Sequence, residues 1–246
     1  MLAHLLGVSR KQIHSQLIEL PEDEREKISA EYNELIQQRL LGRPVQYITA
    51  SAPFRYLDLA VGEGVLIPRP ETELIVDRVI GVLNSSSDKD LPKSVIDLGA
   101  GSGAISIAIA SEALLKGLKV TVVAVEKSPE AALWLNKNIA KYDLPIRVVI
   151  DDVTTALPEV KADLVVANPP YIPDDEKLPL EVERYEPAIA LRGGAVDGMQ
   201  IPKQFIQAAQ RLLKSGGFFI IEHHEKQGEL IRKILAQDFL PAQTHA

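Results

Sequence analysis

The feature that most constrains the fold is a regular alternation of short apolar runs with helical stretches, which begins after Pro70 of the 246-residue chain. The apolar runs, such as residues 120–125 and 163–167, are continuous, which is typical of strands buried on both faces. Such strands, separated by helices, form a parallel sheet with helices on both sides. We therefore expect an α/β fold with a doubly wound, mostly parallel sheet. The expected helices are 71–83, 102–116, 129–141, 202–213 and 225–235; the expected strands are 94–97, 120–125, 146–150, 163–167 and 217–222, with a polar loop at 84–88.

The residues before this alternation predict two smaller units. Apolar residues recur at helical spacing from Ile28 to Leu40 after an acidic first turn, and Gly42 is a typical helix stop. Residues 54–61 indicate instead a two-stranded connector, with a turn at 62–64. The expected domains are therefore a helical domain at 1–50, a β-hairpin linker at 51–66 and the α/β domain at 67–246.

Composition excludes several classes of protein. Cysteine is absent, which excludes disulfides, thiolate metal sites and a cysteine nucleophile. The net charge of −7 argues against a chain that grips a nucleic-acid backbone. No apolar run approaches the roughly 20 residues that span a bilayer, and the N-terminus lacks a signal-peptide pattern. His223 and His224 stand at the end of the strand expected at 217–222, where adjacent side chains point to opposite faces, so we expect no metal site there. We expect a soluble cytoplasmic protein without a membrane partner.

A glycine-rich turn lies between the strand expected at 94–97 and the following helix. Glycines there let a ligand approach the backbone closely, and the helix N-terminus offers free N–H groups. Glu126, at the end of the next strand, can accept both ribose hydroxyls of a nucleoside. The candidate cofactor-binding residues are Asp97, Gly99, Ala100, Gly101, Ser102, Gly103 and Glu126.

The spacing of this turn favours one nucleoside cofactor over another. Gly99-x-Gly101-x-Gly103 differs from the G-x-G-x-x-G turn that binds dinucleotides. S-adenosyl-L-methionine has no pyrophosphate and carries a cationic ammonium and a cationic sulfur. Asp97 at the start of the turn suits such a cation. We therefore expect S-adenosyl-L-methionine as cofactor, with S-adenosyl-L-homocysteine as product, rather than a nicotinamide.

The tetrapeptide Asn168-Pro169-Pro170-Tyr171 follows the strand expected at 163–167, so it should lie beside the glycine turn. An amide or exocyclic amine presents two N–H donors, which the Asn168 side-chain oxygen and the Pro169 carbonyl can accept. Tyr171 can stack on a planar group. We expect catalytic roles for Asn168, Pro169 and Tyr171, and substrate binding by all four residues. The tetrapeptide alone leaves open whether the amino group belongs to a protein or to a nucleic-acid base.

Further motifs make the sequence resemble the release-factor glutamine methyltransferase family, the HemK-like enzymes, over nearly its whole length. The most specific motif covers residues 67–73, which read Ile-Pro-Arg-Pro-Glu-Thr-Glu and are similar to the family's segment that enters the catalytic domain. Other shared positions are Leu41-Gly42-Arg43-Pro44, Glu186-Pro187, Ala190-Leu191, Gly193-Gly194, Asp197-Gly198 and Glu222-His223.

The resemblance implies a Rossmann-like methyltransferase with defined residue roles. Gly99 to Gly103 would hold the methionine end of the cofactor, Glu126 its ribose, and Asp152 and Val153 would border the adenine. Asn168 would touch both cofactor and substrate. The substrate would be the glutamine of the Gly-Gly-Gln motif in class-1 peptide-chain release factors, methylated at N5 in support of translation termination. Residues 1–50 would contact the release factor.

Two other functions stay open, and two departures from the family affect the expectation. Asn-Pro-Pro-Tyr is shared with nucleic-acid amino-methyltransferases, so methylation of adenine N6 or guanine N2 is the alternative reaction. A cofactor-binding protein without catalysis is the other.

Compared with the family, the chain begins partway into the helical domain and ends at residues 243–246, ahead of the final antiparallel strands. We therefore expect missing N-terminal helices and missing C-terminal strands.

Overall fold

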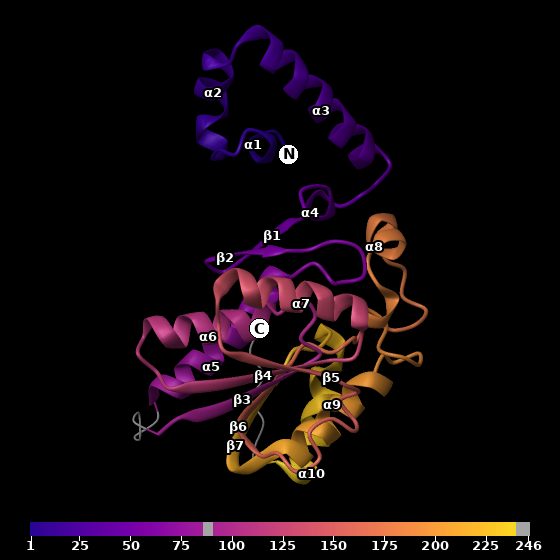
Figure 1. Ribbon diagram of the computed structural model, residues 1–246. Helices are drawn as coiled ribbons and strands as arrows, with labels where there is room; N and C mark the ends of the chain where they lie inside the picture. Colours follow the sequence, from indigo (N-terminus) through magenta and orange to yellow (C-terminus); the bar gives the residue numbers. More distant parts are fainter. Residues whose placement is uncertain (86–90, 240–246) are drawn as a thin grey trace.

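The computed structural model describes residues 1–85 and 91–239, and within them five parallel strands form one sheet between two layers of helices (Figure 1). The sheet order is β5-β4-β3-β6-β7, so the strand order reverses beside β3. This confirms the expected α/β fold. Residues 86–88 of the expected polar loop and the terminal residues 243–246 lie outside the described part. The strands are β3 (Lys93–Leu98), β4 (Val120–Glu126), β5 (Ile146–Ile150), β6 (Ala162–Ala167) and β7 (Leu213–Ile221).

The apolar strands are continuous because each face of the sheet is covered. Along β3, Val95 packs in a cluster with α5 (Glu73–Ser85) and α6 (Ala104–Leu115). The next residue, Ile96, packs on the opposite face with α9 (Gln200–Leu212). Both side chains are buried, so burial does not alternate along the strand. Helix α7 (Pro129–Tyr142) covers the first face beside α6, and α10 (Gly228–Asp238) packs against α9 on the second.

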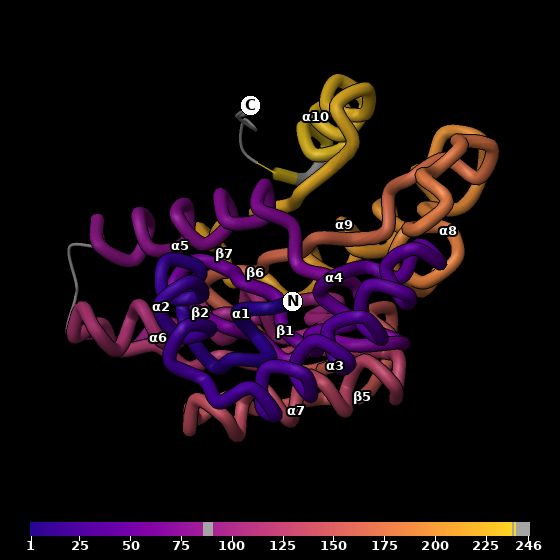
Figure 2. The backbone as a smooth tube through the Cα atoms, turned by 90° about the horizontal axis from the view of Figure 1, so that it is seen from above, coloured from indigo at the N-terminus to yellow at the C-terminus, as the bar shows by residue number. Residues whose placement is uncertain are grey.

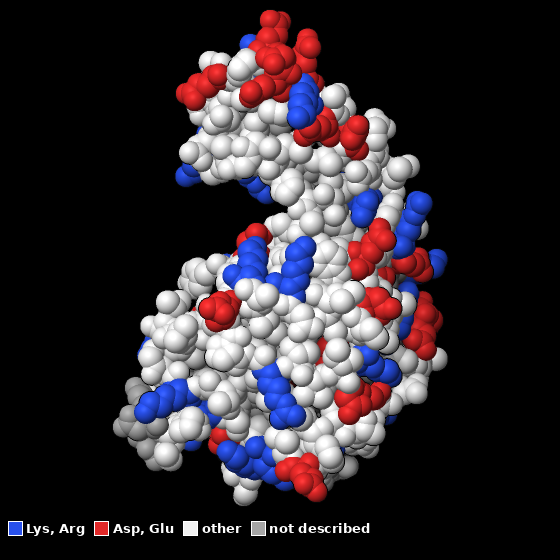
Figure 3. Space-filling model, viewed as in Figure 1, with Lys and Arg blue, Asp and Glu red and all other residues white. Residues whose placement is uncertain are grey.

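The N-terminal part is helical, as expected. It comprises α1 (Leu2–Leu5), α2 (Ile13–Glu19), α3 (Glu22–Leu40) and α4 (Val45–Ile48). The first turn of α3 holds three acidic residues, which stabilise a helix N-terminus. Figure 1 places α1 to α3 at one end of the molecule, away from the sheet, and in the view from above they lie over the α/β part (Figure 2). The space-filling view shows a cleft between them and the α/β part, with acidic side chains gathered at the outer end (Figure 3).

The connector is an antiparallel hairpin of β1 (Ser51–Phe54) and β2 (Leu57–Ala60). The expected turn at 62–64 is not the turn that joins its two strands. The strands are joined at Arg55 and Tyr56, and the turn at 62–64 follows the second strand. Arg55 has a φ of 52°, and its guanidinium pairs with Glu112 of α6 and, at 2.8 Å, with Asp77 of α5. Contacts with distant helices therefore hold this tight turn without a glycine.

Asn138 joins the hairpin to the α/β part. Its fully buried amide donates to the carbonyls of Ala60 and Ser102, both at 2.9 Å, and accepts from the Ala60 N–H at 2.7 Å. One side chain of α7 thus fixes the end of β2 beside the loop after β3.

No helix within residues 1–85 and 91–239 is long and apolar enough to cross a membrane.

Candidate functional site

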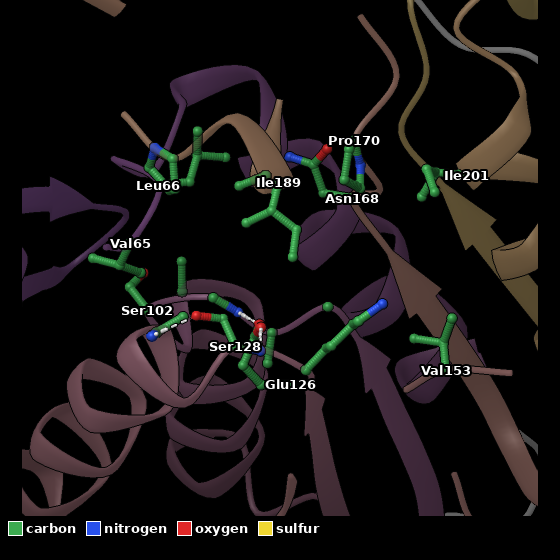
Figure 4. Close-up of a pocket in the computed structure, with 18 of the residues that line it drawn as sticks. Val65, Leu66, Ser102, Glu126, Ser128, Val153, Asn168, Pro170, Ile189 and Ile201 are labelled. Atoms are coloured by element: carbon green, nitrogen blue, oxygen red, sulfur yellow. Dashed lines mark hydrogen bonds between the residues drawn. The ribbon is translucent and has the colours of Figure 1, made fainter. Parts of the chain in front are cut away.

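A cavity of about 300 Å³ opens at the carboxyl ends of the strands, where the strand order reverses (Figure 4). This edge is where open parallel sheets bind ligands. The loops after β3, β4, β5 and β6 all contribute to its wall. Nine of the expected site residues line it: Gly99, Ala100, Gly101, Ser102, Glu126, Asp152, Val153, Asn168 and Pro170.

The glycine turn adopts a backbone that disfavours other residues. Gly99, Gly101 and Gly103 all have positive φ, between 56° and 84°. A Cβ on Gly103 would lie 2.7 Å from Leu135, so this glycine packs tightly against α7. A Cβ on Gly101 would meet no protein atom within 4 Å, and Gly101 faces the cavity. The backbone there is therefore open to a ligand, whereas Gly103 serves packing and does not line the cavity.

Glu126 links the loops after β3 and β4 from beneath the cavity. Its carboxylate accepts the Gly101 N–H at 2.7 Å and the Ser128 N–H at 2.8 Å, one on each oxygen. The residue is 8% exposed and lines the cavity. Each oxygen keeps a second lone pair for a ligand hydroxyl. The carboxylate thus fits the ribose diol of a nucleoside.

Asp97 is not brought to the cavity with the other candidates. The side chain is fully buried, and one oxygen accepts from the backbone N–H and the hydroxyl of Ser106 in α6. The other oxygen has no hydrogen-bond partner among the described residues. Burial raises the pKa of Asp97 to about 7. Its contact with the cofactor stays a prediction, since the carboxyl lies behind the turn.

Asp152 and Val153 form the wall after β5. Lys127 contacts the Asp152 carboxylate at 2.8 Å and, with hydrogen bonds from Thr154, lowers the pKa of Asp152 to about 2. Asp152 is therefore charged throughout the neutral range. Val153 is 7% exposed and packs with the apolar cluster under α9. An apolar surface next to a fixed acceptor suits a purine ring that carries an amino group.

The Asn168-Pro169-Pro170-Tyr171 loop divides between the cavity and the structure behind it. Asn168 and Pro170 line the cavity, whereas Pro169 is buried and Tyr171 lies behind. Asn168 Nδ2 donates to the hydroxyl of Thr72 at 2.9 Å, and the Tyr171 hydroxyl donates to Glu222 at 3.1 Å. Stacking of Tyr171 on a substrate therefore stays a prediction.

Two residues that line the cavity, Thr72 and Ile189, are not among the site residues predicted from the sequence. Thr72 lines the cavity, and its hydroxyl donates to Glu222 at 2.7 Å. Ile189 lines the opening and is 57% exposed. Arg69 holds this side in place, because it pairs with Glu186 at 2.6 Å beside the loop that carries Ile189. The motifs at 67–73 and 186–187 are the sequence signal for this side of the cavity, because the Arg69–Glu186 pair brings these two segments together.

Adjacent histidines follow β7 but do not form a metal cluster. His223 Nδ1 lies 2.8 Å from the His224 carbonyl, and His224 lies 3.7 Å from Glu176. Within residues 1–85 and 91–239, no group of three or more His, Cys, Asp or Glu side chains could hold a metal ion.

Two solved structures share the fold of this chain. A ribosomal protein L11 methylase from Lactobacillus delbrueckii subsp. bulgaricus matches with a TM-score of 0.52 and 19% identity, covering 76% of this chain and 79% of that one. A 16S rRNA N2 G1207 methyltransferase from T. thermophilus, solved with AdoMet and guanosine, matches with a TM-score of 0.50 and 22% identity, covering 77% and 44%. This fold, together with the match of the chain to a methyltransferase family model reported next, defines an S-adenosylmethionine-dependent methyltransferase.

Comparison of sequences identifies the family within that class. Residues 1–49 match the PrmC N-terminal domain, and residues 74–183 match the Methyltransferase small domain. The release factor glutamine methyltransferase of Bifidobacterium longum is 38% identical, covering 99% of this chain and 85% of its own length. That of Corynebacterium glutamicum is 36% identical, covering 96% and 80%. The chain belongs to the release factor glutamine methyltransferase family.

Proposed function

We propose that the protein transfers a methyl group from S-adenosyl-L-methionine to the N5 amide nitrogen of the glutamine in the Gly-Gly-Gln motif of class-1 peptide-chain release factors. The observation that carries this proposal is the state of the Asn168 side chain. Its amide nitrogen donates to Thr72, and its oxygen accepts no hydrogen bond from the described residues. The Asn168 oxygen can therefore accept an N–H from an incoming primary amide, while the hydrogen bond to Thr72 fixes the orientation of the side chain.

The chemistry of an amide nitrogen explains the need for two acceptors. Its lone pair is delocalised into the carbonyl, so it is a poor nucleophile. The Asn168 oxygen and the Pro169 carbonyl would each accept one amide N–H, aligning the nitrogen and favouring its pyramidal form. Orientation of this kind contributes up to roughly 7–11 kcal/mol in ideal cases. No strong base is needed during attack, because the nitrogen becomes acidic only after methylation.

The cofactor candidates divide the cavity by chemistry. S-adenosyl-L-methionine supplies a methyl group on a cationic sulfur. Gly99 to Gly101 would bind its amino acid end through backbone N–H groups, Glu126 its ribose, and Asp152 with Val153 its adenine. The fit is supported by the open face of Gly101 and by the buried carboxylate of Glu126 beside it.

The N-terminal helices are the proposed contact for the release factor. Residues 1–50 would form the substrate-recognition domain, 51–66 the hairpin linker and 67–246 the methyltransferase domain. The cleft between α1–α3 and the α/β part leads toward the hairpin and gives a protein substrate room to enter (Figure 3). A substrate that acts on the ribosome places the reaction in the cytoplasm and links it to translation termination.

The test combines mass spectrometry with one variant. Purified release factor is incubated with the protein and S-adenosyl-L-methionine, in parallel with a mixture of stem-loop DNA and RNA. One added methyl group on the Gly-Gly-Gln glutamine is the expected result. Methylated nucleic acid beside unmodified release factor would instead establish amino-methylation of a base. Cofactor binding without either product would identify a cofactor-binding protein without this catalysis.

The variant Asn168→Ala assigns the site. We expect it to abolish methyl transfer while calorimetry shows only moderate weakening of cofactor affinity, because the remaining cavity residues are unchanged. Loss of all cofactor binding in a normally folded variant would remove Asn168 from its proposed substrate role.

A further inference from the structure

A chain of hydrogen bonds runs from the cavity into the protein behind it. Asn168 Nδ2 donates to Thr72 Oγ1 at 2.9 Å, and Thr72 Oγ1 donates to one oxygen of Glu222 at 2.7 Å. The other oxygen of Glu222 accepts from the Tyr171 hydroxyl at 3.1 Å. The four residues come from the short 3₁₀ helix just before α5, the loop after β6 and the position just after β7. Only Asn168 and Thr72 line the cavity.

The direction of these bonds is set by the carboxylate. An ionised carboxylate only accepts, whereas a threonine hydroxyl has one hydrogen to donate. Since Thr72 gives that hydrogen to Glu222, only its lone pairs face Asn168. Asn168 must then present its NH₂ group to Thr72, which leaves its oxygen for the cavity. The second donor, Tyr171, favours the ionised form of Glu222.

Resting on the proposed function, we infer that Thr72 and Glu222 are positioning residues that hold the Asn168 amide in the one orientation that accepts a hydrogen bond from the substrate amide. With the amide turned over, Asn168 would present N–H groups to a substrate that also presents N–H groups. Neither Thr72 nor Glu222 has to touch the reacting atoms for this effect.

The cost of the arrangement argues for a role beyond packing. Thr72 is 4% exposed. Burial raises the pKa of the Glu222 carboxyl, and within residues 1–85 and 91–239 no cation pairs with it. A carboxylate in such a place is unfavourable for folding unless its hydrogen bonds are used. Its partners are the hydroxyl of Thr72, which faces Asn168, the hydroxyl of Tyr171 and the side chain of Asn168, so its hydrogen bonds lead back to the proposed substrate loop.

Three variants separate this role from packing. Thr72→Val keeps the shape and removes the hydroxyl, and Thr72→Ser keeps the hydroxyl and removes a methyl group. Glu222→Gln keeps the shape but supplies an NH₂ group that can donate to Thr72 and reverse the chain. Thr121→Val, at an exposed position of β4, is the matched control. Steady-state methylation of release factor gives kcat and KM, calorimetry gives the cofactor Kd, and urea unfolding verifies the fold.

We expect Thr72→Val and Glu222→Gln to lower kcat by about tenfold to hundredfold, with KM and cofactor Kd changed less than about threefold. Thr72→Ser should recover most of the activity, and Thr121→Val should match the wild type. Full activity in Thr72→Val or Glu222→Gln would overturn the inference. Equal losses in Thr72→Val and Thr72→Ser would also overturn it, because they would assign the effect to the methyl group.

A measurement without substrate keeps the inference separate from the proposed function. The side-chain NH₂ resonance of Asn168, assigned by its absence in Asn168→Asp, should exchange slowly with solvent in the wild type and in Thr72→Ser. In Thr72→Val this protection should be lost. Unprotected NH₂ protons in the wild type would refute the orientation. A protected amide in a protein that leaves release factor unmodified would refute the proposed function alone.

Discussion

Asp97 offers a direct test of how burial controls charge beneath the site. Asp97→Asn keeps the volume of the side chain, and the amide oxygen can still accept both bonds from Ser106. The variant removes only the charge and adds an NH₂ group at the oxygen that has no partner among the described residues. Any pH dependence that differs between the two proteins then comes from ionisation of Asp97.

The magnitude follows from the shift in pKa. Burial moves the pKa of Asp97 from 3.8 to about 7 in the folded protein. A group with a raised folded pKa stabilises the fold below its unfolded pKa, and that contribution is lost as the pH rises through the folded value. The full shift corresponds to at most about 4 kcal/mol between pH 4 and pH 8. The buried NH₂ group of the variant costs about 1–3 kcal/mol, but equally at every pH.

The assay is urea unfolding between pH 4.5 and pH 8. We expect the stability of Asp97→Asn relative to the wild type to rise by a few kcal/mol across this range. Asp163→Asn is the control, because folding lowers the pKa of Asp163 whereas it raises that of Asp97. Burial opposes its charge, but the backbone N–H and hydroxyl of Ser94 and the ammonium of Lys214 outweigh this and lower the pKa of Asp163 to about 2. Its contribution is complete above pH 5, so its difference from the wild type should stay constant. A constant difference for Asp97→Asn as well would refute the reasoning.

Other substitutions test the cavity and the packing around it. Glu126→Ala should raise the cofactor Kd by about tenfold to hundredfold in calorimetry; an unchanged Kd would exclude the ribose contact. Gly62→Ala would place a Cβ 2.4 Å from Trp134, so urea unfolding should show a loss of about 1–3 kcal/mol. Gly81→Ala in α5 meets no atom within 4 Å and should gain about 0.5–1 kcal/mol; equal effects at both glycines would contradict the packing. Leu135→Ala, in a fully buried position, should cost about 2–5 kcal/mol by the same assay.

The sequence predicted the α/β core well because its signals are local. Each expected strand was found, since a strand buried on both faces needs a continuous apolar run. The hairpin was less predictable. The glycines at 62 and 64 predict a turn that the structure has after β2, but no local signal marks Arg55 and Tyr56, where the two strands are joined. That turn is held by Glu112 and Asp77, whose contacts no local pattern contains.

The site was predicted only as far as it follows single loops. Gly101 and Glu126 could both be predicted as site residues, because they lie at the carboxyl ends of neighbouring parallel strands, which meet at one edge of the sheet. Thr72 and Glu222 are 150 residues apart, and their contact depends on how α5 and β7 pack together. For Asp97, a local motif predicted a contact that the folded chain does not make. Its place in the motif suggested a contact with the cofactor, but the side-chain direction on β3 turns it toward α6.

Because the strand order reverses at β3, the site has two halves that belong to different parts of the sheet. The loops after β3, β4 and β5 carry Gly101, Glu126 and Asp152, on the proposed cofactor side. The loops after β6 and β7 carry Asn168 and Glu222, on the proposed substrate side. Substitutions can therefore accumulate around one half during evolution without disturbing the other. An ancestral scaffold of this shape could exchange its acceptor molecule while inheriting its methyl donor unchanged.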